Sequence, residues 1–292
     1  MAHIAYLGTG LLGSGFVYAA VQRGDHVTVW NRTAEKALAL EPLGARVAAT
    51  PAEAVRGASR VHLVLKDDEV VEAVIGALRP GLAHETIIID HTTTLPSLTA
   101  ERARRLQTEG IRYLHCPVFI GPAAARDSQG TILASGPKAL FDAVRGELAH
   151  MASRVEYFGE RPDLAAVYKL IGNAFIIGIN GLVSDVLTMA AASHVAPAEA
   201  LRILEFFNPS AVIAGRGRNM AVGDYTPSFE LVMARKDIGL MIETAGDAPL
   251  AALPSIAHRM DELIAEGHGQ EDLAVIGRDA LGLPRPTCRA LT

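Results

Sequence analysis

A line of polar side chains runs along one long apolar segment, between residues 162 and 194. On an α-helix, which turns about 100° per residue, its members would fall within about 60° of one another. They are Lys169, Asn173, Asn180 and Ser184. A lysine amine partly removed from water can exchange a proton near neutral pH, and a carboxamide one turn away can orient it or its substrate. Lys169 is therefore a candidate general acid/base, with Asn173 as its neighbour.

Two other interpretations of this segment are open. The amine of Lys169 could extend to solvent from a helix of the protein core. The segment is also long enough to cross a bilayer, although Lys169, Asn180 and Asp185 interrupt its apolar run and disfavour a span. A helix this apolar is not expected to lie on a surface, so most of its circumference should pack against other protein.

A glycine motif near the start of the chain indicates a dinucleotide site. Gly8, Gly10 and Gly13 follow an apolar run at residues 4–7 and precede a predicted helix at residues 14–22. In this setting the first glycine allows a tight turn, the second admits a pyrophosphate, and the third lets helix and strand pack closely. The helix N-terminus would face the phosphate charge. The expected pyrophosphate-binding residues are Gly8, Thr9, Gly10, Leu11, Leu12 and Gly13.

The end of the second predicted strand bears on which nicotinamide cofactor is bound. A carboxylate there would bind the ribose 2′-hydroxyl of NAD, and no acid stands at this point. Asn31, Arg32 and Thr33 can instead donate hydrogen bonds to a 2′-phosphate, and Arg32 supplies positive charge. The expected cofactor is NADP(H). Alternatively, Asn31 or Thr33 caps a helix and Arg32 is solvated.

Two further strand ends carry polar residues that could face a ligand. The predicted strand at residues 86–90 leads into a threonine cluster that includes Thr92 and Thr93, and the strand at residues 61–65 leads into Lys66. In open α/β sheets, ligands lie outside the carboxyl ends of the strands. Alternatively, the threonines form a turn that begins the next helix, and Lys66 is solvated.

The elements that must position these residues alternate between strand and helix as far as Gly159. Strands are predicted at residues 4–7, 27–30, 46–48, 61–65, 86–90, 113–117, 131–134 and 155–158. This alternation predicts an α/β Rossmann domain with a mostly parallel, doubly wound sheet, which the last two strands complete. Beyond Gly159 only helices are predicted, at residues 162–194, 197–206, 229–244, 252–266 and 271–280, with a loop at residues 215–218. We therefore expect an NADP-binding domain at residues 1–161 and an all-α substrate and dimerisation domain at residues 162–292, joined by a long helix.

The composition excludes several classes of protein. The 292 residues are 50% hydrophobic and 20% charged, and a net charge of -5 offers no field for nucleic acid or an anionic membrane. Cys116 and Cys288 lie far apart, and neither they nor the ten histidines show metal-ligand spacing, so neither a disulfide framework nor a metal site is expected. The first residues lack the features of a signal peptide. A cytoplasmic protein is expected.

Six ordered motifs resemble those of the β-hydroxyacid dehydrogenase family, which includes 3-hydroxyisobutyrate dehydrogenase and the glyoxylate/succinic semialdehyde reductases. They are residues 8–13, residues 31–33, residues 90–93, residues 117–118 with 130–131, Lys169 with Asn173, and Lys236 with Asp237. The resemblance implies a Rossmann domain, a helical domain of the 6-phosphogluconate dehydrogenase type, and dimers or tetramers formed through that helical domain. It also implies an enzyme that acts on CH–OH groups, with a small carbonyl or hydroxy acid as substrate.

The resemblance also implies a role for each matched residue. The glycine turn would bind the pyrophosphate, and Asn31, Arg32 and Thr33 the 2′-phosphate. Further cofactor contacts would come from Leu65, Lys66, Thr93 and Lys236, the last closing over the cofactor from the helical domain. Substrate contacts would come from Thr92, Phe119, Ile120, Gly121 and Asn173. Lys169 would be the general acid/base.

The expected substrate loop departs from the family pattern. Members commonly have a serine followed by two glycines there, whose amides bind a carboxylate, whereas this chain has Phe119, Ile120 and Gly121. The change removes a hydroxyl and adds apolar surface. It puts carboxylate recognition in doubt and favours a bulkier or less polar carbonyl.

Three functions fit these observations. The first is a reversible NADP(H)-dependent reductase of a small aldehyde or keto acid. Imine reductases are related and share the architecture; they usually lack the lysine, so Lys169 weighs against them, while Phe119 and Ile120 weigh mildly for them. The third is a sensor that binds NADP without turnover, which the presence of Lys169, Asn173 and Lys236 disfavours.

Overall fold

The computed structural model describes residues 3–282, which fold as two compact units. One unit comprises Met1–Ala174 and the other Phe175–Thr292, so the division falls inside the long helix α8 (Leu164–Ala192). The first turns of α8 group with the α/β unit, and the boundary expected between residues 161 and 162 stays a prediction. Cys288 and the chain from Pro284 onward lie outside the described residues.

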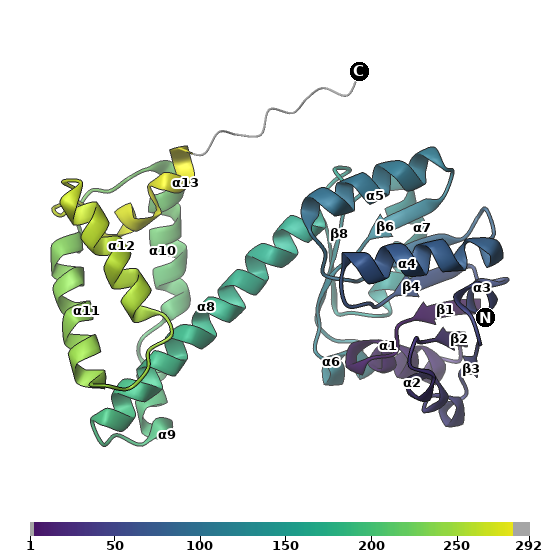
Figure 1. The fold of residues 1–292 in the computed structure, drawn as a ribbon, viewed down its shortest axis with the longest axis horizontal. Helices are drawn as coiled ribbons and strands as arrows, with labels where there is room; N and C mark the ends of the chain where they lie inside the picture. The colour runs from purple at the N-terminus through teal and green to yellow at the C-terminus, as the bar shows by residue number, and fades with distance from the viewer. Residues whose placement is uncertain (1–2, 283–292) are drawn as a thin grey trace. The chain divides into compact units, whose positions relative to one another are not determined.

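Six parallel strands form the main sheet of the first unit, in the order β3-β2-β1-β4-β5-β6 (Figure 1). They are β1 (His3–Leu7), β2 (His26–Trp30), β3 (Arg46–Val47), β4 (Arg60–Leu63), β5 (Ile87–Asp90) and β6 (Arg112–His115). Because all pairings are parallel, the carboxyl ends of the strands meet at one edge. The strand order reverses at β1 and β4, which is where an open α/β sheet binds its ligand. The predicted Rossmann fold is confirmed.

Helices cover both faces of this sheet because its strands are apolar on both sides. In β1, Ile4 and Tyr6 belong to one buried cluster and Ala5 and Leu7 to another. The first cluster includes residues of α1 (Leu11–Gln22), α2 (Ala34–Leu38) and α7 (Lys138–Ala149). The second includes residues of α3 (Pro51–Val55), α4 (Asp68–Leu78) and α5 (Pro96–Thr108).

The last strands of the unit do not complete the main sheet, contrary to the prediction. Instead, β7 (Val118–Phe119), β8 (Thr131–Ala134) and β9 (Arg154–Tyr157) form a separate three-stranded sheet in that order. Pro117 follows β6 after Cys116 and has no N–H to extend the parallel ladder, so the chain leaves the main sheet there. The short helix α6 (Pro122–Arg126) then returns the chain so that β8 pairs antiparallel with β7.

The described part of the second unit is helical, as predicted. Besides the end of α8 it contains α9 (Pro197–Ala200), α10 (Pro209–Val222), α11 (Leu231–Ala245), α12 (Leu253–Ala265) and α13 (Asp279–Gly282). Its core joins Leu231 and Ile238 of α11 to Leu253 and Met260 of α12. Buried Asp185 of α8 accepts hydrogen bonds from the backbone N–H groups of residues 251–253, at 2.6, 2.9 and 2.9 Å. This carboxylate therefore attaches α8 to the start of α12.

Helix α10 occupies the segment where the sequence predicted a loop. Gly215 and Gly217 lower its helix propensity, which is why the local pattern indicated a loop. The helix forms because its ends are well capped: the Asn208 side chain accepts hydrogen bonds from two N–H groups, and Gly223 ends it with φ of 72°. Arg216 also pairs with buried Asp272, which attaches α10 to the rest of the unit.

Helix α8 is largely exposed within the single chain, although its residues are apolar. Its mean hydropathy reaches 1.7 over an 18-residue window of which 6% is buried, so by length and composition alone it passes for a membrane span. Ile177, for example, is 71% exposed. The expectation that this helix packs all round is therefore not met by contacts within one chain.

Candidate functional site

The carboxyl edge of the main sheet gathers those residues of the α/β unit that are predicted to bind the cofactor. Hydrogen bonds join the loops that follow neighbouring strands: the Thr9 N–H donates to Asn31 Oδ1 at 3.0 Å, and the Leu65 N–H donates to Thr92 Oγ1 at 3.1 Å. The first bond ties the loop after β1 to that after β2, and the second ties the loop after β4 to that after β5. Residues far apart in sequence thus form one continuous edge.

The glycine turn is built so closely that side chains cannot enter it. A Cβ on Gly13 would lie 2.0 Å from the carbonyl oxygen of Gly8, and a Cβ on Gly8, whose φ is +101°, would lie 2.2 Å from that of Val64. Gly10, by contrast, has open space where its Cβ would be, and it caps α1 without a side-chain hydrogen bond. The first N–H groups of α1 have no partner within the helix, and no acidic residue stands in its first turn. The turn fits a pyrophosphate.

The residues after β2 differ in what they can offer a cofactor. Asn31 is already used, because it accepts from Thr9 and its amide donates to the Thr33 carbonyl at 2.9 Å. Arg32 and Thr33 are exposed, and Thr33 caps α2 without a side-chain bond. Hence Asn31 shapes the loop, while Arg32 and Thr33 keep polar groups for a ligand.

A second cation, Lys66, acts on the same carboxylate as Arg32, that of Asp67. Lys66 Nζ is 3.3 Å from the carboxylate of Asp67, and its side chain is 83% exposed. The pKa of Asp67 is lowered by the hydrogen bond from the Val70 N–H and further by the positive charges of Lys66 and Arg32. The loops after β2 and β4 thus each supply a cation, Arg32 and Lys66, and positive charge suits an added phosphate.

The threonines after β5 divide into a buried and an exposed position. Thr92 is 2% exposed; its N–H donates to Asp90 Oδ1 at 2.9 Å and its hydroxyl accepts from Leu65. Thr93 is exposed and open to a ligand. Thr92 therefore positions the loop, and Thr93 presents the hydroxyl.

A buried ionic network beneath this loop was missed by the sequence analysis. Asp90 accepts a hydrogen bond from the Tyr113 hydroxyl at 2.8 Å and lies 3.8 Å from Nη1 of Arg102, whose side chain is fully buried. Arg102 also reaches Asp68 and Glu72 on α4, at 2.7 and 2.8 Å. Burial raises the pKa of Asp90, and bonds from Thr92 and the charge of Arg102 oppose that rise. No pattern in α5 distinguished Arg102 from its solvated arginines; only Asp90 at a strand end was a signal.

Three buried histidines lie next to the same loop. The Cys116 carbonyl can only accept, so Nδ1–H of His91 donates to it at 2.7 Å, and His91 Nε2 accepts from His62 Nδ1 at 2.9 Å. Burial lowers the pKa of His91 to about 4 and that of His115 to about 3, and lowers that of His62 well below its usual range. All three are neutral parts of the core at pH 7, in line with a structural role.

The start of α8 is attached to the three-stranded sheet, and this attachment positions Lys169. Ser135 donates a hydrogen bond to the Pro162 carbonyl and accepts one from the Ala165 N–H, both at 2.9 Å. Lys169 Nζ lies 4.1 Å from the centroid of the Phe119 ring, and partial burial lowers its pKa. Asn173, one turn further on, belongs to the same unit. The structure thus brings Lys169 and Phe119 together.

The remaining predicted residues have other surroundings. Ile120 packs against the core of the first unit, and Gly121 caps α6 with open space where its Cβ would be. Lys236 belongs to the second unit, where it is 56% exposed and pairs with Asp237 at 3.0 Å. The polar line on α8 is not one network, since Asn180 donates to the Ile176 carbonyl of its own helix. Among residues 3–282, no three His, Cys, Asp or Glu side chains form a group suited to a metal ion.

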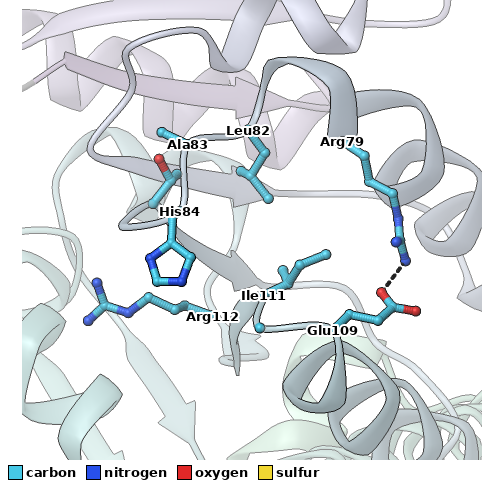
Figure 2. Close-up of a pocket in the computed structure, with 9 residues that line it drawn as sticks. Arg79, Leu82, Ala83, His84, Glu109, Ile111 and Arg112 are labelled. Atoms are coloured by element: carbon cyan, nitrogen blue, oxygen red, sulfur yellow. Dashed lines mark hydrogen bonds and ion pairs between the residues drawn. The ribbon is translucent and has the colours of Figure 1, made fainter.

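One cavity of about 270 Å³ lies away from these residues, beside the amino ends of β5 and β6 (Figure 2). Figure 2 shows Arg79 turned to Glu109, with which it pairs, and Arg112 pairs with Glu85 at 3.0 Å. Because its arginines are already neutralised by neighbouring glutamates, we do not assign this cavity to a ligand.

Comparison with known proteins shows which proteins the chain is similar to. Residues 3–159 match the family model described as the NAD binding domain of 6-phosphogluconate dehydrogenase. An uncharacterized oxidoreductase of Shewanella frigidimarina is 28% identical over 87% of this chain and 90% of its own length. The 3-sulfolactaldehyde reductase of Escherichia coli is 27% identical over 94% of this chain and 95% of its own. The cytokine-like nuclear factor N-PAC of Homo sapiens is 29% identical over 85% of this chain, which spans only 46% of N-PAC.

Solved structures show the same fold over nearly the whole chain. An imine reductase from Myxococcus stipitatus in complex with NADP+ has a TM-score of 0.85 at 21% identity and covers 94% of this chain and 99% of its own. A reductive aminase from Aspergillus terreus, in complex with NADPH4, cyclohexanone and allyl amine, has a TM-score of 0.85 at 23% identity. The match covers 94% of this chain and 98% of the aminase chain. At such identities the likeness shows the fold and no more.

The neutral histidines predict a loss of stability in mild acid. The unfolded chain binds protons with a histidine pKa near 6.5, whereas folded His91 binds its proton only near pH 4. The stability due to neutral His91 is therefore complete above about pH 6.5 and is lost as pH falls towards 4, by up to about 1.4 kcal/mol per pH unit. Urea unfolding of the wild type and of His91→Gln between pH 4.5 and 7.5 measures this. We expect the free energy of unfolding to depend less steeply on pH in His91→Gln than in the wild type. The control His258→Gln, at an exposed histidine, should show the wild-type dependence. The same dependence in all three proteins would contradict the prediction.

Proposed function

The chain belongs to the family of the NAD-binding domain of 6-phosphogluconate dehydrogenase and is an NAD(P)-dependent oxidoreductase, and on that premise we propose its cofactor, reaction and acid/base. The cofactor is NADP(H). The reaction is reversible hydride transfer between the nicotinamide and a small carbonyl or β-hydroxyacid-type substrate, an aldehyde or a keto acid in the direction of reduction. Lys169 is the general acid/base.

The observation that carries this proposal is the partly buried Lys169 against the Phe119 ring, on a helix attached to the α/β unit. The bound nicotinamide supplies or accepts the hydride. Reduction of a carbonyl leaves an alkoxide that needs a proton, and an ammonium held at a fixed place can donate it and stabilise the developing charge. Burial lowers the pKa of Lys169, so that the amine can also accept the proton in the reverse reaction. Asn173, one turn away, orients the substrate or the amine.

The preference for NADP(H) is supported by the charges beside β2. Arg32 and Thr33 are exposed, the charges of Arg32 and Lys66 both act on Asp67, and no carboxylate follows β2 to bind a ribose hydroxyl. A planar guanidinium can bind a phosphate with two hydrogen bonds. The role of Lys236 at the cofactor stays a prediction from the family resemblance.

Reduction of an imine is the alternative reaction. The apolar side chains of Phe119 and Ile120 favour this reaction, since an imine needs no carboxylate site. Lys169 weighs against it, since imine reductases usually lack a lysine at this position. A protein that binds NADP without turnover is the further alternative. The assay below separates the three.

The exposed apolar side of α8 supports a homodimer or homotetramer formed through the helical unit. Ile177 and its neighbours Phe175, Ile176 and Ile179 are each between 46% and 71% exposed in the single chain. Burying such surface against a second copy removes it from water, at about 25 cal/mol per Å². A cytoplasmic location, expected from the sequence, stays a prediction.

Replacing Lys169 tests the reaction. In Lys169→Ala we expect kcat for NADPH-dependent carbonyl reduction to fall by about 10²–10⁴-fold, because the proton donor is lost, while the Kd of NADPH changes less than twofold. The measurement is NADPH oxidation over a panel of aldehydes, keto acids and cyclic imines, with Lys138→Ala as an exposed-lysine control. Turnover of imines alone, or carbonyl activity indifferent to Lys169, contradicts the proposal. Binding of NADPH with no turnover on the whole panel indicates the sensor.

Replacing Arg32 tests the cofactor preference. In Arg32→Ala the Kd of NADPH should rise about 10- to 100-fold, since a charge-assisted hydrogen bond is worth about 1.5–3 kcal/mol, and the Kd of NADH should stay constant. Quenching of the fluorescence of Trp30 or enhancement of NADPH fluorescence measures both. Arg145→Ala, an exposed arginine on α7, is the matched control. An equal loss for both cofactors rules against a 2′-phosphate contact.

Sedimentation equilibrium tests the assembly. At micromolar concentration we expect a dimer or tetramer, and Ile177→Lys should shift it towards monomer because a charge would be buried in the interface. Leu38→Lys, at an exposed leucine of the α/β unit, should leave the mass unchanged. A monomeric wild type is the contrary result.

A further inference from the structure

The backbone of Phe119 is held in place by the strand beside it. Phe119 pairs with Thr131 in the antiparallel β7–β8 ladder. Next to Thr131 stands Gly130, with φ of +103°, and a Cβ there would lie 2.7 Å from the Phe119 carbonyl oxygen. Only a glycine permits this approach, so the strand carrying Phe119 is seated directly on the loop before β8.

The ring of Phe119 occupies the space that a side chain at position 172 would need. A Cβ on Gly172 would lie 2.2, 2.8 and 3.0 Å from three carbons of the ring. Gly172 comes three residues after Lys169 and so lies on the same side of α8. The ring therefore packs against bare helix backbone beside the lysine.

The ring also covers the lysine head group. At 4.1 Å from the ring centroid, the Lys169 ammonium makes a cation–π contact, worth about 0.5–2 kcal/mol depending on exposure. Within residues 3–174 it makes no ion pair, and burial alone lowers its pKa. Its charge is thus balanced by the face of an aromatic ring rather than by a carboxylate.

We propose, on the basis of the function proposed above, that Phe119 selects among those substrates: the site prefers aldehydes and ketones with uncharged, apolar substituents to keto acids and other carbonyl compounds with a carboxylate. Phe119 and Ile120 would present apolar side chains to a substrate carboxylate where the family offers a serine hydroxyl, and apolar surroundings make the burial of a charge costly. The cation that contacts Phe119 within residues 3–174 is Lys169. A carboxylate that paired with Lys169 would compete with the ring for the ammonium group. It would also accept the hydrogen bond that the carbonyl oxygen of the substrate requires.

The test compares substrates that differ by a carboxylate. For the wild type we expect kcat/KM for pentanal to exceed that for 4-oxobutanoate at least tenfold. In Phe119→Ser, which opens space and adds a hydroxyl, we expect the ratio of kcat/KM for pentanal to that for 4-oxobutanoate to fall by at least tenfold. Phe119→Leu should keep the preference for pentanal, and Gly172→Ala should shift it in the same direction as Phe119→Ser, because the new Cβ displaces the ring.

Two further measurements separate the role of the ring from a general loss of structure. The pH profile of kcat should move to lower pH in Phe119→Leu, since removing the ring removes the group that favours the ammonium form. Leu98→Ser, at an exposed position of α5, should change neither the profile nor the substrate ratio. An unchanged NADPH Kd shows that each variant is folded.

The outcomes distinguish this inference from the proposed function. Turnover that depends on Lys169 but prefers 4-oxobutanoate, or a substrate ratio unmoved in Phe119→Ser, overturns the role of Phe119 alone. If no carbonyl is reduced, the proposed function fails, and competition between butanoate and butanamide for the NADPH complex still tests the inference. The wild type should then favour butanamide and Phe119→Ser should favour butanoate; equal binding in both proteins overturns it.

Discussion

Helix α1 makes two contacts so close that only glycine fits. On one side, Gly13 meets the carbonyl of Gly8 at the end of β1; on the other, a Cβ on Gly15 would lie 2.8 Å from both Ala125 and the Pro122 carbonyl of α6. The first contact sets the N-terminus of α1 against the glycine turn that we propose binds the cofactor phosphates. The second sets α6, and with it the strand that carries Phe119, against the same helix. The proposed cofactor and substrate residues of this unit thus share one rigid framework.

The first turns of α8 belong to this framework as well. Ser135 binds the backbone at both Pro162 and Ala165, and Tyr168 stacks on Phe158 with ring centroids 4.0 Å apart. Both partners come from the three-stranded sheet or the residues that follow it. The three-stranded sheet, although small, therefore positions the helix that carries Lys169.

The sequence allowed much of this to be predicted, wherever the signal was local. The apolar residues of β5 and the glycine turn after β1 indicated a parallel sheet and a dinucleotide site, because strand burial and turn geometry depend on neighbouring residues. Other features depend on contacts between distant segments and could not be inferred. Two residues are too few to show β7 as a strand, Arg102 looks like any helix arginine, and nothing around Gly172 reveals the ring that packs against it.

The contact between Phe119 and Gly172 makes the residue that fits at one position depend on the residue at the other. While the ring keeps its place, a Cβ at 172 would lie 2.2 Å from its nearest carbon, so a residue larger than glycine can enter only if the ring moves aside. A side chain at 172 would in turn leave less room for an aromatic ring at 119. The two positions should therefore vary together among relatives.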